Sequence, residues 1–325
     1  MEKIQAAAQP AAAQQKTIRQ TSKKESTFVR SLRTDGALFV MLIPVIAFYL
    51  IFCYGPMYGA VIAFKDYKPN LGILGSPWVG MKHFKDFFSS YYFGTILRNT
   101  LVISVSSLVV GFPIPIVLAL LLNELKNKAF ARVVQTISYM PHFISLVVVC
   151  SLIRSFTSDT GLITYFWSAI TGEERLSMLQ DPAKFVPIYV LSGVWQEVGW
   201  SSIIYIAALA GVDQELYEAA KIDGAGKMRQ MWHITLPGIL PTVIIMLILR
   251  MGQLLSVGFE KIILLYNPAI YDTAEVISTF VYRRGLLEAN WSYSAAVGLF
   301  NSAVNIVLLT AANWLSRRVT EQSLW

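Results

Sequence analysis

Charged side chains are scarce in this sequence: Asp, Glu, Lys and Arg make up 14% of the 325 residues, whereas 55% of the residues are hydrophobic. The mean hydropathy of +0.52 is too high for a soluble globular domain of this length. We therefore expect a membrane protein. The formal net charge of +7 is expected to meet anionic lipid, and it does not require a nucleic-acid partner.

Cysteine and histidine are also rare. Cys53 and Cys150 are the only cysteines, and both lie in apolar windows, so neither a disulfide framework nor a cysteine metal site is supported. The three histidines, His83, His142 and His233, are far apart and lack the spacing of metal ligands. We expect no metal site in this chain.

Enzyme motifs are missing as well: neither G-x-S-x-G nor H-E-x-x-H occurs. The "GAGKM" segment resembles the end of a phosphate-binding loop. However, Met228 follows Lys227 where Ser or Thr would bind magnesium, and Lys221 occupies the position of the first glycine. We therefore expect no catalytic residues and no cofactor bound by this chain itself.

Long apolar runs are what the sequence has instead. A helix needs about 20 residues to cross roughly 30 Å of hydrocarbon, and it satisfies its own backbone hydrogen bonds there. The sequence predicts an all-α polytopic membrane protein with six transmembrane helices within residues 37–315. The six windows are residues 37–55, 97–122, 133–153, 186–211, 238–258 and 293–315.

Proline falls in or at the edge of five of these windows, at Pro44, Pro113 with Pro115, Pro141, Pro187 and Pro241. Neighbouring helices or water can satisfy the carbonyl groups that proline leaves free. Two interpretations stay open, simple kinks or broken helices that line a path.

The two ends of the chain are polar. Residues 1–36 combine the low-complexity "QAAAQPAAAQQ" with a basic stretch, and we expect them to be a disordered cytoplasmic tail; residues 316–325 form a second tail. Seven Lys or Arg residues precede the first window, and basic residues follow the second and the sixth. The positive-inside rule then places both termini in the cytoplasm.

A charged loop, residues 213–237, interrupts the apolar windows and is expected to face the cytoplasm. Asp213 is a candidate N-cap, and Asp223 with Gly224 predicts a turn at the end of a first short helix. A second short helix is expected to end before Pro237. The loop is then a helix-turn-helix knob, although an ordinary amphipathic interfacial loop is the alternative.

Two opposite charges lie near the middle of apolar windows, Glu197 and Arg250. A charge at the bilayer centre costs about 2.5 to 3.5 kcal/mol on insertion scales, so neither should face lipid. They could pair with each other, or line a wet cavity with Gln196 and Gln253. Trp195 could supply an apolar stacking platform there, and Arg250 could bind a carboxylate of a solute if Glu197 does not occupy it.

The charged loop carries the pattern EAA, three residues, Gly, nine residues, then I-x-L-P. It resembles the signature of permease subunits of binding-protein-dependent ATP-binding-cassette importers. The stretches "YGAVIAFKDYKPNLGILGSPWVGMKHFKDFF" and "NWLSRRVTEQSLW" resemble the LplB-type branch of carbohydrate permeases, which includes a permease of the alginate importer. The coupling residues implied are Glu218, Ala219, Ala220, Asp223, Gly224, Ala225, Ile234, Leu236 and Pro237.

The resemblance implies a type I importer permease fold in a bacterial cell membrane. It further implies a second permease subunit, two ATPase subunits that hold ATP and Mg, and an extracytoplasmic solute-binding protein. Loop 213–237 would be the coupling helix that contacts an ATPase. Tyr266, Asn267 and Pro268 would belong to the surface where the binding protein docks, and the cargo would be a sugar or oligosaccharide.

Other classes stay open at this point. The chain could be the permease of a non-carbohydrate importer. A secondary transporter would couple ions through the intramembrane polar residues, but no inverted repeat relates the two halves. A membrane-anchored scaffold would need neither the polar residues nor an ATPase.

Overall fold

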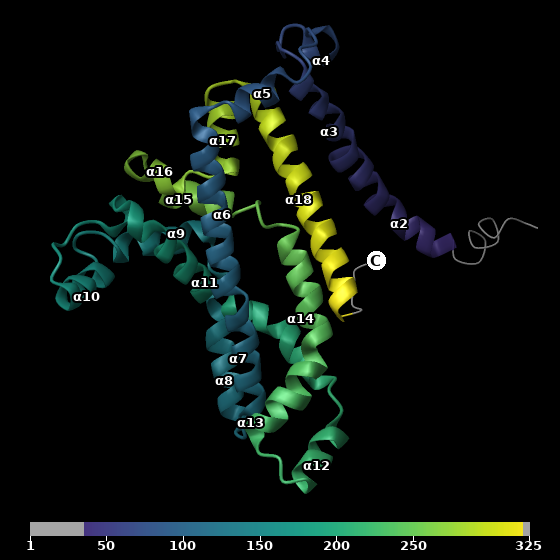
Figure 1. Ribbon diagram of the computed structural model, residues 1–325, viewed down its shortest axis with the longest axis vertical. Helices are drawn as coiled ribbons and strands as arrows, with labels where there is room; N and C mark the ends of the chain where they lie inside the picture. The colour runs from purple at the N-terminus through teal and green to yellow at the C-terminus, as the bar shows by residue number, and fades with distance from the viewer. Residues whose placement is uncertain (1–35, 321–325) are drawn as a thin grey trace, which may run out of the picture. The chain divides into compact units, whose positions relative to one another are not determined.

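The computed structural model describes residues 36–320. The predicted N-terminal tail lies outside the described residues except for Gly36, and the predicted C-terminal tail is described only to residue 320. The described chain is almost entirely helical (Figure 1), and its one β feature is an isolated bridge between Lys65 and Trp78. It divides into two compact units, one up to Gly59 and the other from Ala60 onward.

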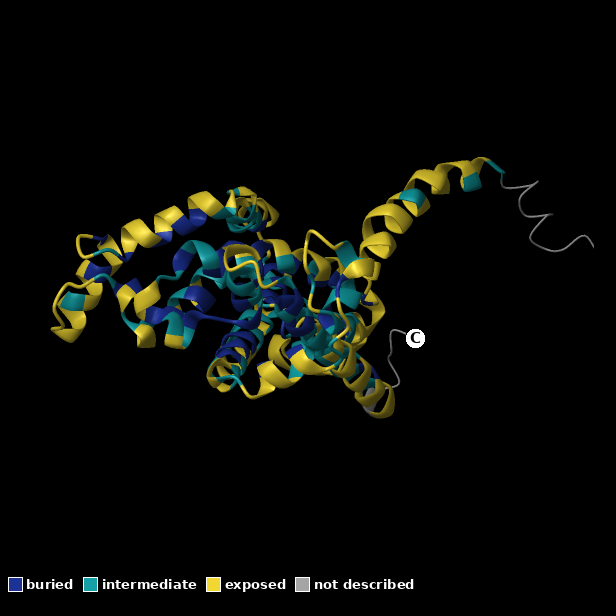
Figure 2. Ribbon diagram, turned by 90° about the horizontal axis from the view of Figure 1, so that it is seen from above, coloured by how far each residue is buried: buried dark blue, intermediate teal, exposed yellow. Residues whose placement is uncertain are grey.

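The first unit is a single run of helix. It begins with α2 (Gly36–Phe48) and continues through a π-helical turn, η1 (Tyr49–Tyr54), into α3 (Gly55–Met57). None of these residues is buried, and the run is yellow along nearly all of its length in Figure 2. Its apolar side chains are therefore available to lipid or to another subunit. Pro44 lies inside α2 without breaking it.

The second unit contains the remaining helices, which meet along buried faces (dark blue in Figure 2). The segment η2 (Tyr58–Phe64) leads into it. The other helices are α4 (Gly72–Gly75), α5 (Lys82–Phe88), α6 (Tyr91–Gly111), α7 (Pro113–Glu124), α8 (Lys128–Tyr139), η3 (Met140–Phe143), α9 (Leu146–Phe156), α10 (Leu162–Thr171), η4 (Met178–Gln180), α11 (Pro182–Ala210), α12 (Gln214–Ile222), α13 (Lys227–Gln230), η5 (Met231–Thr235), α14 (Leu236–Met251), α15 (Phe259–Leu265), η6 (Pro268–Ile270), α16 (Tyr271–Ala274), α17 (Ile277–Tyr282), η7 (Arg283–Leu287) and α18 (Trp291–Thr320).

The prediction of an all-α membrane protein is confirmed. Four helical runs in the described residues are long and apolar enough to span a membrane, or five when one bent pair counts as a span. The four are Gly36–Phe64, Tyr91–Glu124, Lys227–Met251 and Trp291–Arg318. With its 29 residues, α11 is long enough to be the remaining span, but Gln196 and Glu197 in its middle make it less apolar. The structure is thus compatible with six spans.

The predicted third span, residues 133–153, is not one continuous helix. Its two halves, Lys128–Phe143 and Leu146–Phe156, are bent by 97° at the break that follows Pro141. Ser145 caps the second half by accepting a hydrogen bond from the Val148 amide. At this proline the broken-helix interpretation is correct, whereas Pro187 and Pro241 lie inside intact helices.

Three apolar clusters hold the second unit together. One joins α6, α9, α11 and α15 around Ile103, Phe185 and Ile262. Another joins α7, α11 and α14 around Tyr205 and Ile239. The third packs aromatic rings of α5 and α17 against α6 and α18. Because α11 takes part in two of the three clusters, it is the central helix of this unit.

A close backbone approach fixes α8 against α11. A Cβ added at Gly199 would lie 2.1 Å from the carbonyl oxygen of Ser138, closer than real Cβ contacts. Only glycine permits the two backbones to approach in this way. The contact places the break between α8 and α9 beside the middle of α11.

We expect Gly199→Val to separate α8 from α11 and to lower stability by about 1 to 3 kcal/mol, the usual cost of overpacking. The measurement is the thermal unfolding temperature and the yield of the purified protein in detergent. Gly94→Val, at a helical glycine whose added Cβ would meet no atom within 4 Å, is the control and should unfold near the wild-type temperature. Equal unfolding temperatures for the two variants would contradict the packing argument.

Candidate functional site

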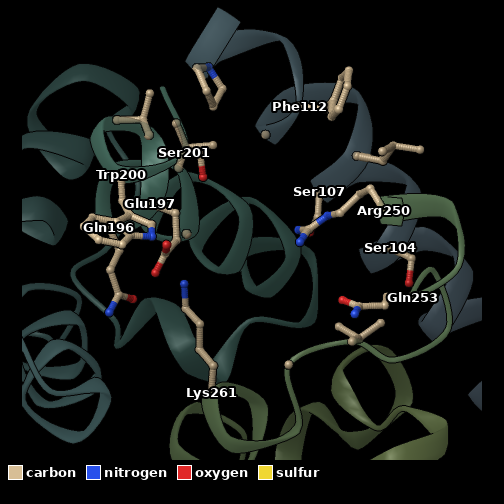
Figure 3. A pocket seen from close by; sticks show the side chains of 18 of the residues that line it. Ser104, Ser107, Phe112, Gln196, Glu197, Trp200, Ser201, Arg250, Gln253 and Lys261 are labelled. Atoms are coloured by element: carbon tan, nitrogen blue, oxygen red, sulfur yellow. The ribbon is translucent and has the colours of Figure 1, made fainter. Parts of the chain in front are cut away.

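The second unit encloses a cavity of about 700 Å³, called here the central cavity (Figure 3). Its walls come from α6, α7, α11, α14, the segment 252–258 and α15. Both polar and apolar side chains line it, which suits a polar ligand better than a lipid tail. The polar lining residues include Ser104, Ser107, Gln196, Glu197, Ser201, Arg250, Gln253, Ser256 and Lys261.

One face of α11 supplies the largest share of the lining. Gln196, Glu197, Trp200 and Ser201 are on this face, as predicted for the first two. Trp195 is not among the residues that line this cavity, and its role as a stacking platform stays a prediction. At 3.6 residues per turn, position 195 lies about 160° around the helix from position 197. The tryptophan that lines the cavity is Trp200, three residues after Glu197 and therefore on the same face; Phe112, Tyr189 and Tyr205 are further aromatic lining residues.

Glu197 is hydrogen-bonded to a residue that sequence analysis did not single out. Its Oε2 lies 2.9 Å from Nδ1 of His142, in the break between α8 and α9. The His142 ring also stacks on Trp200, with centroids 4.4 Å apart and planes within 2°. Glu197 therefore has a partner on η3, and that partner is not Arg250.

Arg250 lies at the end of its helix and not in the middle of a span. The predicted window 238–258 is helical only to Met251, where α14 ends and an irregular segment begins. Among the described residues, the side chain of Arg250 makes no hydrogen bond or ion pair, and its guanidinium group borders the cavity (Figure 3). The pairing of Arg250 with Glu197 is thus not formed, and the geometry favours the cavity hypothesis.

A second cation, Lys261 on α15, also borders the cavity. Its side chain is 7% exposed, its Nζ donates to the carbonyl of Tyr189 at 3.1 Å, and it lies 4.9 Å from the centre of the Tyr189 ring. In the described chain no carboxylate is within ion-pair distance of it. Its position inside "FEKIILL", among apolar residues, is the sequence signal that could have identified it.

The irregular segment between α14 and α15 is held by α18. The Asn305 side chain accepts a hydrogen bond from the Leu255 amide at 3.2 Å and donates one to Ser256 Oγ at 3.0 Å. A Cβ at Gly252 would lie 2.8 Å from Leu309, so the segment packs closely on the same helix. The Asn305 side chain thus gives the Leu255 amide the hydrogen-bond acceptor that a backbone carbonyl would have supplied in a continuous helix.

The predicted knob is present in residues 213–237, at the opposite end of the second unit from α5 and α17 (Figure 1). Asp213 caps α12 through the Glu215 amide at 2.9 Å, as predicted. Gly224 has φ of +73°, the left-handed conformation that ends α12, and the Ala225 amide donates to the Ala220 carbonyl. The expected second helix does not end before Pro237: α13 continues through η5 into α14, where proline is tolerated in the first turn.

The coupling residues divide into an exposed and an inward set. Glu218, Ala219, Asp223, Gly224 and Pro237 are exposed, and Ala220 and Ala225 are half-buried. Ile234 and Leu236 pack instead against the cluster around Ile239. A hydrogen bond of 2.9 Å between Tyr217 and Thr235 joins the two sides of the knob.

The residues predicted to meet a binding protein lie in a short loop before α16. Tyr266 packs on the Tyr271 ring, and Asn267 donates to the Leu179 carbonyl while capping η6 through the Ala269 amide. Both side chains therefore shape the loop. Pro268 and Ala269 are the exposed residues at its tip.

Broken membrane helices around a polar cavity, with a helical knob at one end, define a membrane transport subunit. The chain belongs to the family described as the inner membrane component of binding-protein-dependent transport systems, whose model matches residues 111–321. Members of this family are transport components, so the chain is a permease subunit and not an enzyme.

The chain is similar to two proteins of Bacillus subtilis strain 168. Protein LplB is 45% identical over 306 residues, covering 94% of this chain and 96% of LplB. The polygalacturonan/rhamnogalacturonan transport system permease protein YteP is 46% identical over 306 residues, covering 93% and 94% of the two chains.

One crystal structure is similar throughout: a bacterial ABC transporter involved in import of the acidic polysaccharide alginate. It matches with a TM-score of 0.83 and 44% identity, and the match covers 90% of this chain and 99% of that chain. The type I permease fold expected from the sequence is thereby confirmed.

Because Glu197 and Arg250 are not paired, we expect Glu197→Gln and Arg250→Met to act independently. The change in unfolding free energy of the double variant should equal the sum of the single changes within about 0.5 kcal/mol. Thermal unfolding of the three variants in detergent measures this. Recovery of wild-type stability in the double variant would instead show a structural pair.

Proposed function

We propose that the chain is one of two permease subunits of an ATP-driven importer, and that its cargo is an acidic oligosaccharide. The observation that carries the proposal is the central cavity with Arg250 and Lys261 in its wall, both outside any ion pair within the described residues. Arginine binds carboxylates through two parallel hydrogen bonds, and serine and amide side chains suit sugar hydroxyls.

Similar proteins support the same substrate class. Alginate is an acidic polysaccharide, and the name of YteP refers to polygalacturonan, a polymer of galacturonic acid. A related crystal structure contains an alginate pentasaccharide bound to a periplasmic protein. We infer that a binding protein delivers the cargo to this chain too, at the end of the second unit that carries Pro268.

The knob is proposed as the contact with an ATPase subunit. It exposes apolar side chains that a soluble loop would bury: Ile222 is 87% exposed, Met228 64% and Trp232 61%. Two ATPase subunits would hold ATP and Mg, and their closure would move the knob and thereby the helices around the cavity. The knob and both termini would then lie in the cytoplasm.

The cargo is tested by ATP-dependent uptake into proteoliposomes that contain the complete importer and its loaded binding protein. We expect Arg250→Met to lower the uptake rate of an oligouronate by about tenfold, as loss of a charge-assisted contact of about 1.4 kcal/mol would do. Arg250→Lys keeps the positive charge but lacks the planar guanidinium group that binds a carboxylate through two hydrogen bonds. Its uptake rate should therefore lie between those of the wild type and Arg250→Met. Uptake of neutral oligosaccharides only, or of a non-sugar anion, would contradict the proposed cargo.

Coupling is tested at Gly224. No atom lies within 4 Å of an added Cβ, so a substitution acts through the positive φ alone. Gly224→Val should misplace the knob and abolish the ATPase activity that loaded binding protein stimulates, because β-branched residues disfavour this conformation.

Gly224→Asn is the matched control for that experiment. Asparagine tolerates the left-handed conformation, so this variant should keep most of the stimulated activity. Normal stimulation in Gly224→Val, with equal amounts of assembled complex, would rule out the proposed contact.

A further inference from the structure

We propose that His142 sets the charge of the central cavity: by holding Glu197, it leaves Lys261 and Arg250 free to meet an anionic cargo. The inference rests on the proposed function and adds a positioning residue to it. His142 is not itself among the residues that line the cavity. It acts through Glu197, which does line the cavity.

Two contacts fix the direction in which His142 donates. Its ring is parallel to that of Trp200, and Nδ1 lies 2.9 Å from the carboxylate of Glu197. A carboxylate only accepts hydrogen bonds, so Nδ1 must carry the proton. The stacking holds the ring plane, and the ring plane aims the N–H at Glu197.

The fold brings His142 to this position by breaking a helix. His142 lies in η3, directly after Pro141 and before the bend of 97° between α8 and α9. The close approach of Gly199 to Ser138 sets α8 against α11 two residues after Glu197 and directly before Trp200. A straight third span would carry the residues after Pro141 along its own axis and away from α11.

The alternative partner of Glu197 is Lys261. Their side chains point toward each other from different walls of the cavity, while Arg250 enters from another side (Figure 3). The Glu197 side chain is 48% exposed and carries the charge opposite to that of Lys261, so the two groups attract each other across the cavity. Without His142, Glu197 would turn to Lys261, and one of the two cations would no longer be available to cargo.

The charge of the cavity can be measured without any cargo. Ser201, on the lining face of α11, becomes the reporter as Ser201→Cys in a Cys53→Ser, Cys150→Ala background. In the complete importer, the rates at which an anionic and a cationic methanethiosulfonate modify this cysteine are followed by mass spectrometry of its peptide. The ratio of the anionic to the cationic rate reports the local potential.

His142→Phe keeps a ring on Trp200 and removes the donor. We expect this variant to lower the ratio of the anionic to the cationic rate on the order of tenfold. When Glu197 turns to Lys261, the potential near the reporter cysteine becomes less positive, which slows the anionic reagent and speeds the cationic one. His142→Asn places an amide nitrogen near the Nδ1 position and should keep the wild-type ratio. Combining His142→Phe with Glu197→Gln should bring the ratio back to at least the wild-type value.

An unchanged ratio in His142→Phe overturns the inference. The inference is also overturned if the ratio falls in His142→Phe and stays low in His142→Phe with Glu197→Gln. In that case the histidine ring would affect the ratio only through packing and not through Glu197. If His142→Phe does not assemble, His142→Gln makes the same comparison. The amide nitrogen of glutamine lies at the Nε2 position, so this variant also has no donor at the Nδ1 position that faces Glu197. A wild type that imports no oligouronate would contradict the proposed function but would not change the meaning of the ratio.

Discussion

Backbone amide and carbonyl groups in hydrocarbon must find hydrogen-bond partners within the protein, because each unsatisfied group costs several kcal/mol. The second unit nevertheless has three breaks in its helical hydrogen-bond ladders, at Pro113 where α6 runs on into α7, between α8 and α9, and after α14. Proline, which has no amide hydrogen, begins α7; Ser145 caps α9; Asn305 accepts from the Leu255 amide. All three breaks border the central cavity, where irregular backbone is tolerated.

The same breaks determine which charges the cavity contains. Because α14 ends at Met251, Arg250 lies beside the irregular segment, and the chain returns along α15 with Lys261 at the wall. Because the third span bends after Pro141, His142 reaches Glu197. These two breaks therefore each supply a charged or hydrogen-bonding group that a continuous helix would have carried past the cavity, and together they produce a polar cavity with two cations outside any ion pair in the described chain.

Local signals were sufficient for the membrane class, the helical fold and the knob, because apolar run length, the Asp213 cap and Gly224 act within a few residues. They were insufficient for the site. Pro141 alone does not predict the bend in the run 133–153, because Pro187 and Pro241 lie inside intact helices. The close approach that holds α8 beside α11 joins Gly199 and Ser138, which are 61 positions apart in the sequence. Helical spacing already places Trp200, and not Trp195, on the face of α11 that carries Glu197, but which face of α11 lines a cavity depends on its neighbours. The partner of Glu197 required the tertiary position of His142, and Lys261 required the return of the chain after α14.

We propose that the cavity conducts an acidic oligosaccharide past Arg250 and Lys261. An electron cryomicroscopy structure of the complete importer, stalled with an oligouronate in the path, would test this proposal. We expect a cargo carboxylate within about 3 Å of the Arg250 guanidinium or the Lys261 ammonium, the distance of a charge-assisted hydrogen bond. Cargo that passes neither cation, or an Arg250 in an ion pair with Glu197 while cargo is bound, would contradict it.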